Sequence, residues 1–326
     1  MLEIIDIMNN NLTYHKSELT KTGDKMIDVT LIGTGGMLPL PDRYLASCLI
    51  EFNGKSILID CGEGTQISLH KGKLSMNKIE TILITHCHAD HVSGLPGLLL
   101  TIGNQGRTEP LYIFAPRGST KYINSLLIVC GYLPYEVRIA ELHDSKGHEF
   151  EQIGFNITSI PLKHHINCLG YSLELKLKPR FLPEKAKKLN IPVNFWKTLH
   201  RGEIINVDGN TFTPQMVLGE PRKSIKISYV TDTRPVKNIK DIVKYSDLFI
   251  CEGMYGEDEQ LDNAKEKLHM IFSEAAQIAK EAEVNELWLT HFSPSMSKPD
   301  EFINYAKNIF SNTKIGRDLM TTTLKN

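Results

Sequence analysis

The 326-residue sequence lacks the features that mark secreted, disulfide-rich and membrane-spanning proteins. Its six cysteines form no closely spaced pair, so neither a disulfide framework nor a zinc site made only of cysteines is indicated. No apolar run approaches the ~20 residues that cross a bilayer, and Glu3 and Asp6 stand where a signal peptide would be basic. We therefore expect a soluble, cytoplasmic protein with no membrane contact.

A strong net charge is also lacking. The chain carries 37 Lys and Arg against 38 Asp and Glu, a net charge of −1, which argues against indiscriminate binding to nucleic acid but permits a local basic surface. A hydrophobic content of 41% is enough for one large core. Residues 1–25 are polar with weak periodicity, so we predict an N-terminal extension there and one domain with an insertion over residues 26–326.

What the sequence does contain is a dense group of histidines in LITHCHADHVSGLPGLLL, from Leu83 to Leu100. The apolar run over residues 81–85 predicts a strand that ends where His86, His88, Asp90 and His91 begin. Side chains alternate along a strand, so His86 and His88 point to one side and can share a metal ion. This motif predicts a metal site more strongly than the alternative, a histidine-rich loop whose rings are satisfied by backbone hydrogen bonds.

A single metal ion cannot easily be bound by all four of these side chains. Asp90 and His91 are sequence neighbours whose side chains diverge in a helix or a strand, which makes it awkward for both to reach the ion that His86 and His88 bind. A second ion removes this difficulty and gives the two-metal arrangement that acts on phosphoryl and acyl centres. Imidazole and carboxylate ligands favour zinc, and manganese and iron are compatible with them.

Further polar residues follow other predicted strands, at the edge where open α/β sheets commonly place their sites. They are Asp60, His164 with His165, Asp232, Glu252 and His291. Asp60 either orients a ligand or is an ordinary turn residue, and the choice of ligand between His164 and His165 stays open. His269, in a helical pattern over residues 263–282, forms a proton relay with Glu252 or is an ordinary helix histidine.

Strands and helices alternate along most of the chain, which predicts an α/β fold of two sheets covered outside by helices. The predicted strands cover residues 29–33, 46–52, 56–60, 81–85, 111–115, 137–142, 149–162, 225–231, 247–251 and 286–290. The predicted helices cover residues 65–72, 94–103, 120–129, 263–282 and 299–310.

The segment from Lys176 to Arg201 differs from the rest of the chain. It holds eight Lys or Arg against one acidic residue, a charge of +7, with Phe181, Phe195 and Trp196 between the basic residues. Concentrated positive charge with interleaved aromatic residues is typical of surfaces that bind a phosphate backbone. A solvated helical hairpin without a ligand is the alternative.

The motifs together resemble the ribonuclease Z branch of the metallo-β-lactamase-fold superfamily, endonucleases that mature the 3′ end of transfer RNA precursors. The likeness extends from about Ile27 to the last predicted helix. It rests on LIGTGG, ILIDCGEGTQ, THCHADHVSGLPGLL, the H-x5-G-Y spacing from His164 to Tyr171, TDTRP at Asp232 and LTHFS at His291.

The resemblance implies an αββα metallo-β-lactamase-like sandwich of two mixed sheets with outer helices and a basic arm inserted at about residues 176–205. It assigns two zinc ions per subunit, with His86, His88 and His164 on one, Asp90, His91 and His291 on the other, and Asp232 between them. Glu252 and His269 correspond to a pair that assists protonation of the leaving group.

The reaction that the resemblance implies is removal of the 3′ trailer of precursor tRNA by metal-activated hydroxide, with Asp90 orienting the hydroxide and a 3′-hydroxyl left behind. The basic arm from Lys176 to Arg201 would hold the tRNA, and the protein would be a homodimer.

The chain departs from the family where Val193 follows Ile191-Pro192, where Tyr44 follows Arg43, and after His269. The alternative is a metallo-hydrolase of the same fold acting on a small phosphodiester, lactone or thioester. A metal-binding regulator without enzymatic activity would require a damaged ligand set, and the set is complete.

Overall fold

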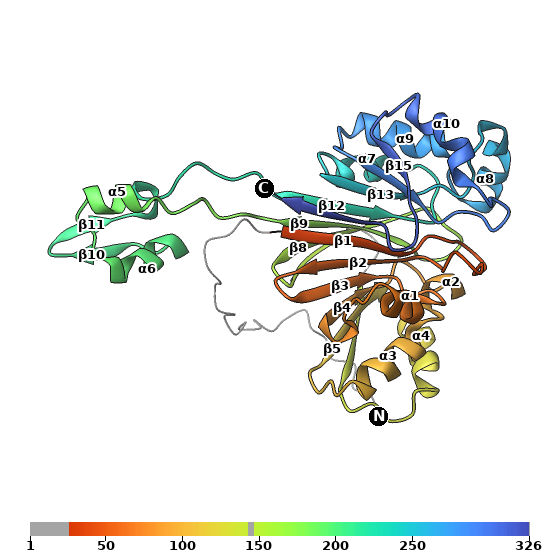
Figure 1. Ribbon diagram of the computed structural model, residues 1–326, viewed down its shortest axis with the longest axis horizontal. Coiled ribbons are helices and arrows are strands. Elements are labelled where there is room, and N and C mark those ends of the chain that lie inside the picture. The colour runs from red at the N-terminus through yellow and green to blue at the C-terminus, as the bar shows by residue number, and fades with distance from the viewer. Residues whose placement is uncertain (1–25, 143–146, 326) are drawn as a thin grey trace. The chain divides into compact units, whose positions relative to one another are not determined.

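The structure, a computed structural model, describes residues 26–142 and 147–325. The predicted N-terminal extension, residues 1–25, lies outside the described residues. The described residues form two compact units, one made of residues 26–142, 147–174 and 226–325 and the other of residues 175–225. The larger unit contains both large sheets and all the predicted site residues (Figure 1).

The first sheet of the larger unit has seven strands in the order β16-β1-β2-β3-β4-β5-β6. Strands β3 to β6 are parallel, and the pairs β16–β1, β1–β2 and β2–β3 are antiparallel. The bounds are β1 (Met26–Gly33), β2 (Ser47–Phe52), β3 (Lys55–Ile59), β4 (Ile79–Leu83), β5 (Leu111–Pro116), β6 (Val137–Leu142) and β16 (Thr321–Lys325).

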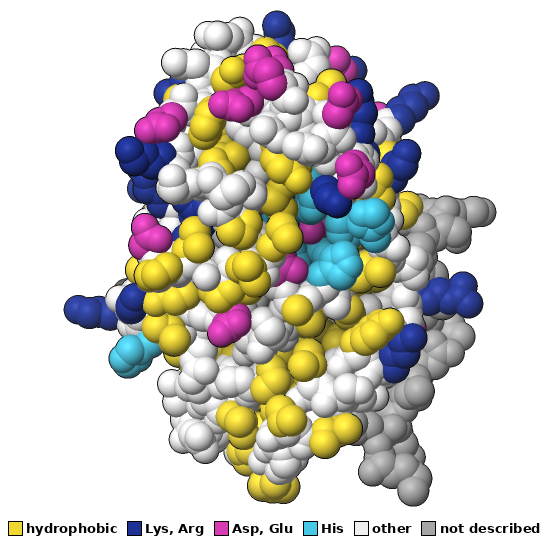
Figure 2. Space-filling model, turned by 90° about the vertical axis from the view of Figure 1, so that its right-hand side faces the viewer, with side chains coloured by type: hydrophobic (Ala, Val, Ile, Leu, Met, Phe, Trp, Pro, Cys, Tyr) yellow, Lys and Arg dark blue, Asp and Glu magenta, His cyan; other side chains and the backbone are white. Residues whose placement is uncertain are grey.

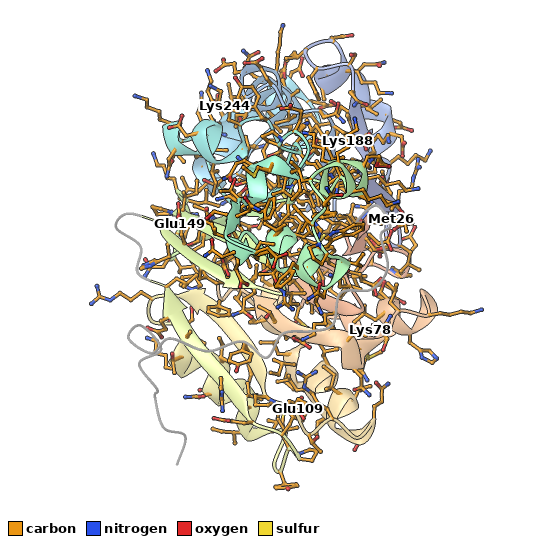
Figure 3. The ribbon with its side chains drawn as sticks, turned by 90° about the vertical axis from the view of Figure 1, so that its left-hand side faces the viewer. Met26, Lys78, Glu109, Glu149, Lys188 and Lys244 are labelled. Atoms are coloured by element: carbon orange, nitrogen blue, oxygen red, sulfur yellow. The ribbon has the colours of Figure 1, made fainter. Side chains whose placement is uncertain are left out.

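The second sheet also has seven strands, in the order β15-β14-β13-β12-β9-β8-β7. Strands β12 to β15 are parallel and strands β7 to β9 are antiparallel, so both sheets are mixed. The bounds are β7 (His148–Gln152), β8 (Phe155–Pro161), β9 (Leu169–Leu175), β12 (Ile225–Val230), β13 (Leu248–Glu252), β14 (Leu287–Thr290) and β15 (Thr313–Ile315). Figure 3 marks Glu149 on β7 and Met26 at the start of β1.

The two sheets pack against each other and are joined near the ends of β4 and β9. The Tyr171 hydroxyl donates to the Ile84 carbonyl at 2.7 Å, and the Leu169 N–H donates to the Thr85 carbonyl at 2.8 Å. Phe52 of the first sheet meets Phe155 of the second edge to face, with ring centroids 5.5 Å apart. These contacts hold the ends of strands from both sheets close together.

Helices cover the outer face of each sheet (Figure 1). Leu98, Leu99 and Ile123 are buried against the first sheet, and Phe272, Ala275 and Ala279 against the second. The helices are α1 (Thr65–Lys71), α2 (Ala89–Val92), α3 (Leu95–Asn104), α4 (Thr120–Ile128), α7 (Lys237–Val243), α8 (Leu261–Lys267), α9 (Phe272–Glu281) and α10 (Ile303–Lys307), with short 3-10 helices η2 (Met76–Lys78), η5 (Asp258–Gln260) and η6 (Pro299–Phe302). The predicted fold class, two mixed sheets with outer helices, is confirmed.

Three predicted elements were wrong in detail. The helix predicted over residues 263–282 is two helices, because Leu268 takes a left-handed φ of 58° after α8, and Glu274 accepts the Ile271 N–H at 3.2 Å where α9 begins. The strand predicted over residues 149–162 is the hairpin of β7 and β8, turned at Ile153 and Gly154, which both have positive φ as in a type I′ turn. The closing helix predicted over residues 299–310 is η6 and the short α10, and two strands, β15 and β16, follow it.

The smaller unit, residues 175–225, has a hydrophobic core of its own. Ala186, Leu199 and Val217 are fully buried in it. Its elements are α5 (Pro183–Lys188), η3 (Val193–Phe195), α6 (Trp196–Arg201), β10 (Ile205–Val207), β11 (Asn210–Phe212) and η4 (Pro214–Met216). In the part of the chain that the structure describes, no helix has the length and apolar character that a bilayer crossing requires.

Candidate metal centre

The predicted ligands all follow strand ends at one edge of the two sheets. β4 of the first sheet leads to His86 and His88, and α2 carries Asp90 and His91. In the second sheet, His164 follows β8, Asp232 follows β12 and His291 follows β14. The structure therefore brings all seven predicted ligand residues together, three of them from strands far apart in the sequence. His165 is exposed, so of the two histidines after β8 it is His164 that turns into this group.

Three histidines and one carboxylate form the first cluster. His88 Nδ1 lies 3.0 Å from His86 Nε2 and 3.1 Å from His164 Nε2. Asp232 Oδ2 lies 3.6 Å from His86 Nε2 and 3.8 Å from His164 Nε2. Burial lowers the pKa of His86 well below its usual value and the pKa of His164 to about 4. The rings are therefore neutral at physiological pH, which is the form that binds a metal.

Two histidines and two carboxylates form the second cluster. His91 Nε2 and His291 Nε2 are 3.1 Å apart, and Asp232 Oδ1 lies 3.3 Å and 3.2 Å from them. Asp90 Oδ2 lies 3.3 Å from His291 Nε2 and 3.6 Å from His91 Nε2. Asp232 thus directs one oxygen to each cluster, as the bridging role requires.

The donor atoms of both clusters fit metal ions. A tetrahedral zinc site with bonds of about 2.0–2.1 Å separates its ligand atoms by about 3.4 Å, close to the separations within each cluster. Burial opposes a charge on His91, but Asp232 and Asp60 outweigh that effect and raise its pKa well above the usual value. The carboxylates therefore attract positive charge into this buried site, as a bound cation would supply.

Asp60 orients the second cluster and is not an ordinary turn residue. It is fully buried, with Oδ2 2.8 Å from His91 Nδ1, and it accepts the Thr85 N–H at 2.8 Å. A hydrogen bond of this kind fixes which ring nitrogen of a metal-binding histidine faces the site. Asp60, Asp232 and His291 all have left-handed backbones, with φ of 57°, 50° and 57°, so sharp turns at the strand ends aim these side chains.

The glycine-rich turn after β1 belongs to the site, which the sequence did not reveal. A Cβ on Gly36 would lie 2.7 Å from the ring of His291, so the close approach of this turn requires glycine. The next residue, Met37, donates its N–H to Asp90 Oδ2 at 2.8 Å. The two consecutive glycines in LIGTGG were the available signal.

Glu252 and His269 form a pair beside the two clusters. His269 Nδ1 lies 3.0 Å from Glu252 Oε2, and its ring centroid lies 5.3 Å from that of His164 and 5.6 Å from that of His291. Burial opposes the charged imidazole, but Glu252 outweighs it and raises the pKa of His269 to about 9. The predicted relay is therefore assembled, with a protonated imidazole at neutral pH.

The centre opens to solvent on one face of the molecule. Figure 2 shows histidine side chains gathered near the middle of this face, with acidic atoms between them and hydrophobic side chains around them. All six cysteines are free, and those close in sequence to site residues, Cys61, Cys87 and Cys168, pack in or against the interior.

Comparisons with known proteins show the family and the fold of the chain. A family model described as Anti-Pycsar protein Apyc1 matches residues 27–182. The crystal structure of human tRNase Z, short form, is 25% identical with a TM-score of 0.66, covering 90% of this chain and 98% of that chain. The metallo-β-lactamase fold protein YhfI from Bacillus subtilis is 20% identical with a TM-score of 0.68, covering 92% of this chain and 100% of that chain. Among curated relatives, Ribonuclease Z from Clostridium kluyveri is 50% identical over 294 residues, which are 90% of this chain and 97% of the relative. The chain therefore belongs to the ribonuclease Z family, metal-dependent endoribonucleases of the metallo-β-lactamase fold.

Proposed function

We propose that this enzyme is a zinc-dependent endoribonuclease that cleaves the 3′ trailer from precursor tRNA and leaves a 3′-hydroxyl on the tRNA. The observation that carries the proposal is the pair of clusters that share Asp232, with the Glu252–His269 pair next to them. A nuclease needs this combination because it must both stabilise charge at phosphorus and protonate an alkoxide leaving group. The relatives named ribonuclease Z and tRNase Z support the substrate.

We propose two zinc ions per subunit, with manganese or iron as substitutes. The first would be held by His86, His88 and His164, the second by Asp90, His91 and His291, with Asp232 between them. Bound metal would polarise the phosphodiester and lower the pKa of the attacking water.

The side chains supply the remaining steps. The carboxylate of Asp90 is held by the Met37 N–H, so it has a fixed direction from which to orient the attacking water. His269 uses Nδ1 toward Glu252, which leaves Nε2 to donate the proton to the departing 3′ oxygen. The products are a tRNA with a 3′-hydroxyl and a trailer with a 5′-phosphate.

The basic arm at about residues 176–205 is the proposed tRNA contact. All eight of its Lys and Arg residues are exposed: Lys176, Lys178, Arg180, Lys185, Lys187, Lys188, Lys197 and Arg201. Phe181, Phe195 and Trp196, in contrast, pack against the core of the smaller unit. The arm would therefore contact the phosphate backbone through charge, while its aromatic residues maintain its fold.

We also propose that the enzyme is a homodimer in which one subunit's arm serves the other's site. Four large side chains in and after α4 are exposed: Tyr122 by 50%, Ile128 by 77%, Val129 by 71% and Tyr132 by 87%. An apolar surface of this kind is typical of a protein interface.

The deciding experiment is cleavage of a precursor tRNA with a 3′ trailer, with the cleavage position read on a gel. We expect one cut after the discriminator nucleotide, and Asp90→Ala should lower the rate at least a hundredfold while the fold is retained. A metal-loaded Asp90→Ala enzyme with full activity would contradict the mechanism. Cleavage of bis(p-nitrophenyl) phosphate but not of the precursor would favour the alternative, a hydrolase of a small phosphodiester, lactone or thioester.

A further inference from the structure

Arg234 connects the turn after β12 to the loop that carries His269. It lies two residues after Asp232, and its side chain is only 13% exposed. Its Nη1 donates to the backbone carbonyl of His269 at 2.5 Å and to Glu274 Oε2 at 2.9 Å, and its Nη2 donates to Glu274 Oε1. One largely buried guanidinium therefore binds both the His269 loop and the first turn of α9.

The preceding residue, Thr233, ties the same turn to Glu252 and to the segment before His164. Its N–H donates to Glu252 Oε1 at 2.5 Å, and its Oγ1 accepts the Lys163 N–H at 3.0 Å. The Arg234 N–H donates to the Lys163 carbonyl at 3.2 Å. These hydrogen bonds hold the turn that carries Arg234 in place. The Arg234 side chain can therefore fix the position of the His269 loop that it contacts.

The His269 loop has further anchors on either side of the histidine. It is the break between α8 and α9, where Leu268 is left-handed, and the His269 N–H donates to the Ala264 carbonyl at 2.8 Å. Glu252 holds the imidazole through Nδ1 and also accepts the Met270 N–H at 3.1 Å, so it fixes both the ring and the residue after it. Arg234 adds a contact to the carbonyl of His269 itself, so the backbone that carries the imidazole is held from a second side.

We infer that Arg234 is a positioning residue for proton donation: by holding the His269 carbonyl and Glu274, it fixes the direction in which His269 Nε2 meets the leaving oxygen. This inference rests on the proposed role of His269. A purely structural ion pair between Arg234 and Glu274 is the alternative, and it predicts a different result when the leaving group needs no proton.

The test compares two substrates of the metal-loaded, full-length enzyme. Cleavage of precursor tRNA expels an alkoxide that needs a proton, whereas bis(p-nitrophenyl) phosphate expels p-nitrophenolate, a stable anion. The variants are Arg234→Met, Arg234→Lys and, as the reference for loss of the acid, His269→Ala. Arg138→Met is the matched control, because Arg138 also makes an ion pair with a carboxylate, Glu136, but on β6 of the other sheet. Metal content and thermal unfolding are measured for each variant.

We expect Arg234→Met to lower kcat on precursor tRNA by about tenfold or more, a part of the ~10²–10⁴-fold that a general acid contributes, with little change in KM. Its rate on bis(p-nitrophenyl) phosphate should stay within about threefold, because no proton is needed there. Arg234→Lys, which keeps one contact, should lie in between, and Arg138→Met should match the parent on both substrates.

Four results would overturn the inference. If Arg234→Met and Arg234→Lys lose activity equally on both substrates, the residue is structural; if they lose none, it has no role in the reaction. If His269→Ala shows no difference between the substrates, the proposed acid is wrong and the inference fails with it. If His269→Ala distinguishes the substrates and the Arg234 variants do not, the inference alone fails. Should Arg234→Met not fold, Arg234→Lys decides.

Discussion

At the scale of single residues, Glu252 sets the protonation of His269. Because the buried carboxylate raises the pKa of His269 to about 9, the acid form is present at neutral pH and is lost as the pH rises through that value. Glu252→Gln keeps the size of the side chain but removes the charge. The alkaline limb of kcat on precursor tRNA should therefore move to lower pH, toward the usual histidine value of 6.5, and activity at pH 8 should fall far more than activity at pH 6.

A pH–rate profile of both proteins measures this shift. Glu51→Gln is a suitable control, since Glu51 is a partly exposed carboxylate on β2. An alkaline limb that stays in place in Glu252→Gln would show that His269 is not the acid.

The residues differed in how far their roles could be predicted. His86, His88, Asp90 and His91 were predictable because six neighbouring residues encode their own geometry. His164, Asp232 and His291 were identified through the family resemblance, since only the order of the strands in the sheets brings these strand ends together. Asp60 stayed ambiguous and Gly36 was missed, because their roles depend on contacts with His91 and His291 that no local pattern encodes.

At the scale of elements, α5 carries concentrated charge in the proposed arm. Replacing Lys185, Lys187 and Lys188 together by Ala should weaken binding of precursor tRNA and reduce the slope of log K against log salt by about 2, because each lost phosphate contact removes ~0.7–0.9. Hydrolysis of bis(p-nitrophenyl) phosphate should not change. Binding titrations at several salt concentrations measure the slope.

The matched control replaces three exposed lysines in and after α7, Lys237, Lys240 and Lys244. Figure 3 labels one residue of each set, Lys188 and Lys244. Equal effects of the two triple variants would mean that the arm has no special part in binding tRNA.

Elements were predictable where hydrophobic periodicity and turn residues agreed, as in β5, α3 and α4. The pattern failed between α8 and α9 because apolar spacing continues across the break, and Leu268 is a residue type that rarely adopts positive φ. β15 and β16 were missed because they are short, and because β16 opens with three consecutive threonines, which give no apolar alternation, at the edge of the first sheet. The predicted boundaries of the extension and of the arm stay predictions.

At the scale of the whole molecule, the exposed surface after α4 predicts the oligomeric state. A homodimer should have twice the 36.8 kDa chain mass in light scattering, and Ile128→Glu with Tyr132→Glu should reduce it to the mass of one chain. Burying two carboxylates in an apolar interface is costly, which is the reason for the expected dissociation. A native enzyme that scatters as a single chain would exclude the dimer.

The origin of the seven candidate ligands has a mechanical consequence for the larger unit. Four come from the first sheet and three from the second, so bound metal would act as a cross-link between the sheets, much as a disulfide ties two segments. Removing the metal with a chelator should therefore weaken the contact between the two sheets. Amide hydrogen exchange should accelerate most at Leu169 and its neighbours, where the sheets meet, and least at Leu98 and Leu99, which pack on the outer face of the first sheet. The melting temperature should fall as well, since a ligand at a thousandfold excess over its Kd contributes about 4 kcal/mol. Uniform acceleration would instead mean that the metal stabilises the fold as a whole, and an unchanged pattern that the sandwich closes without it.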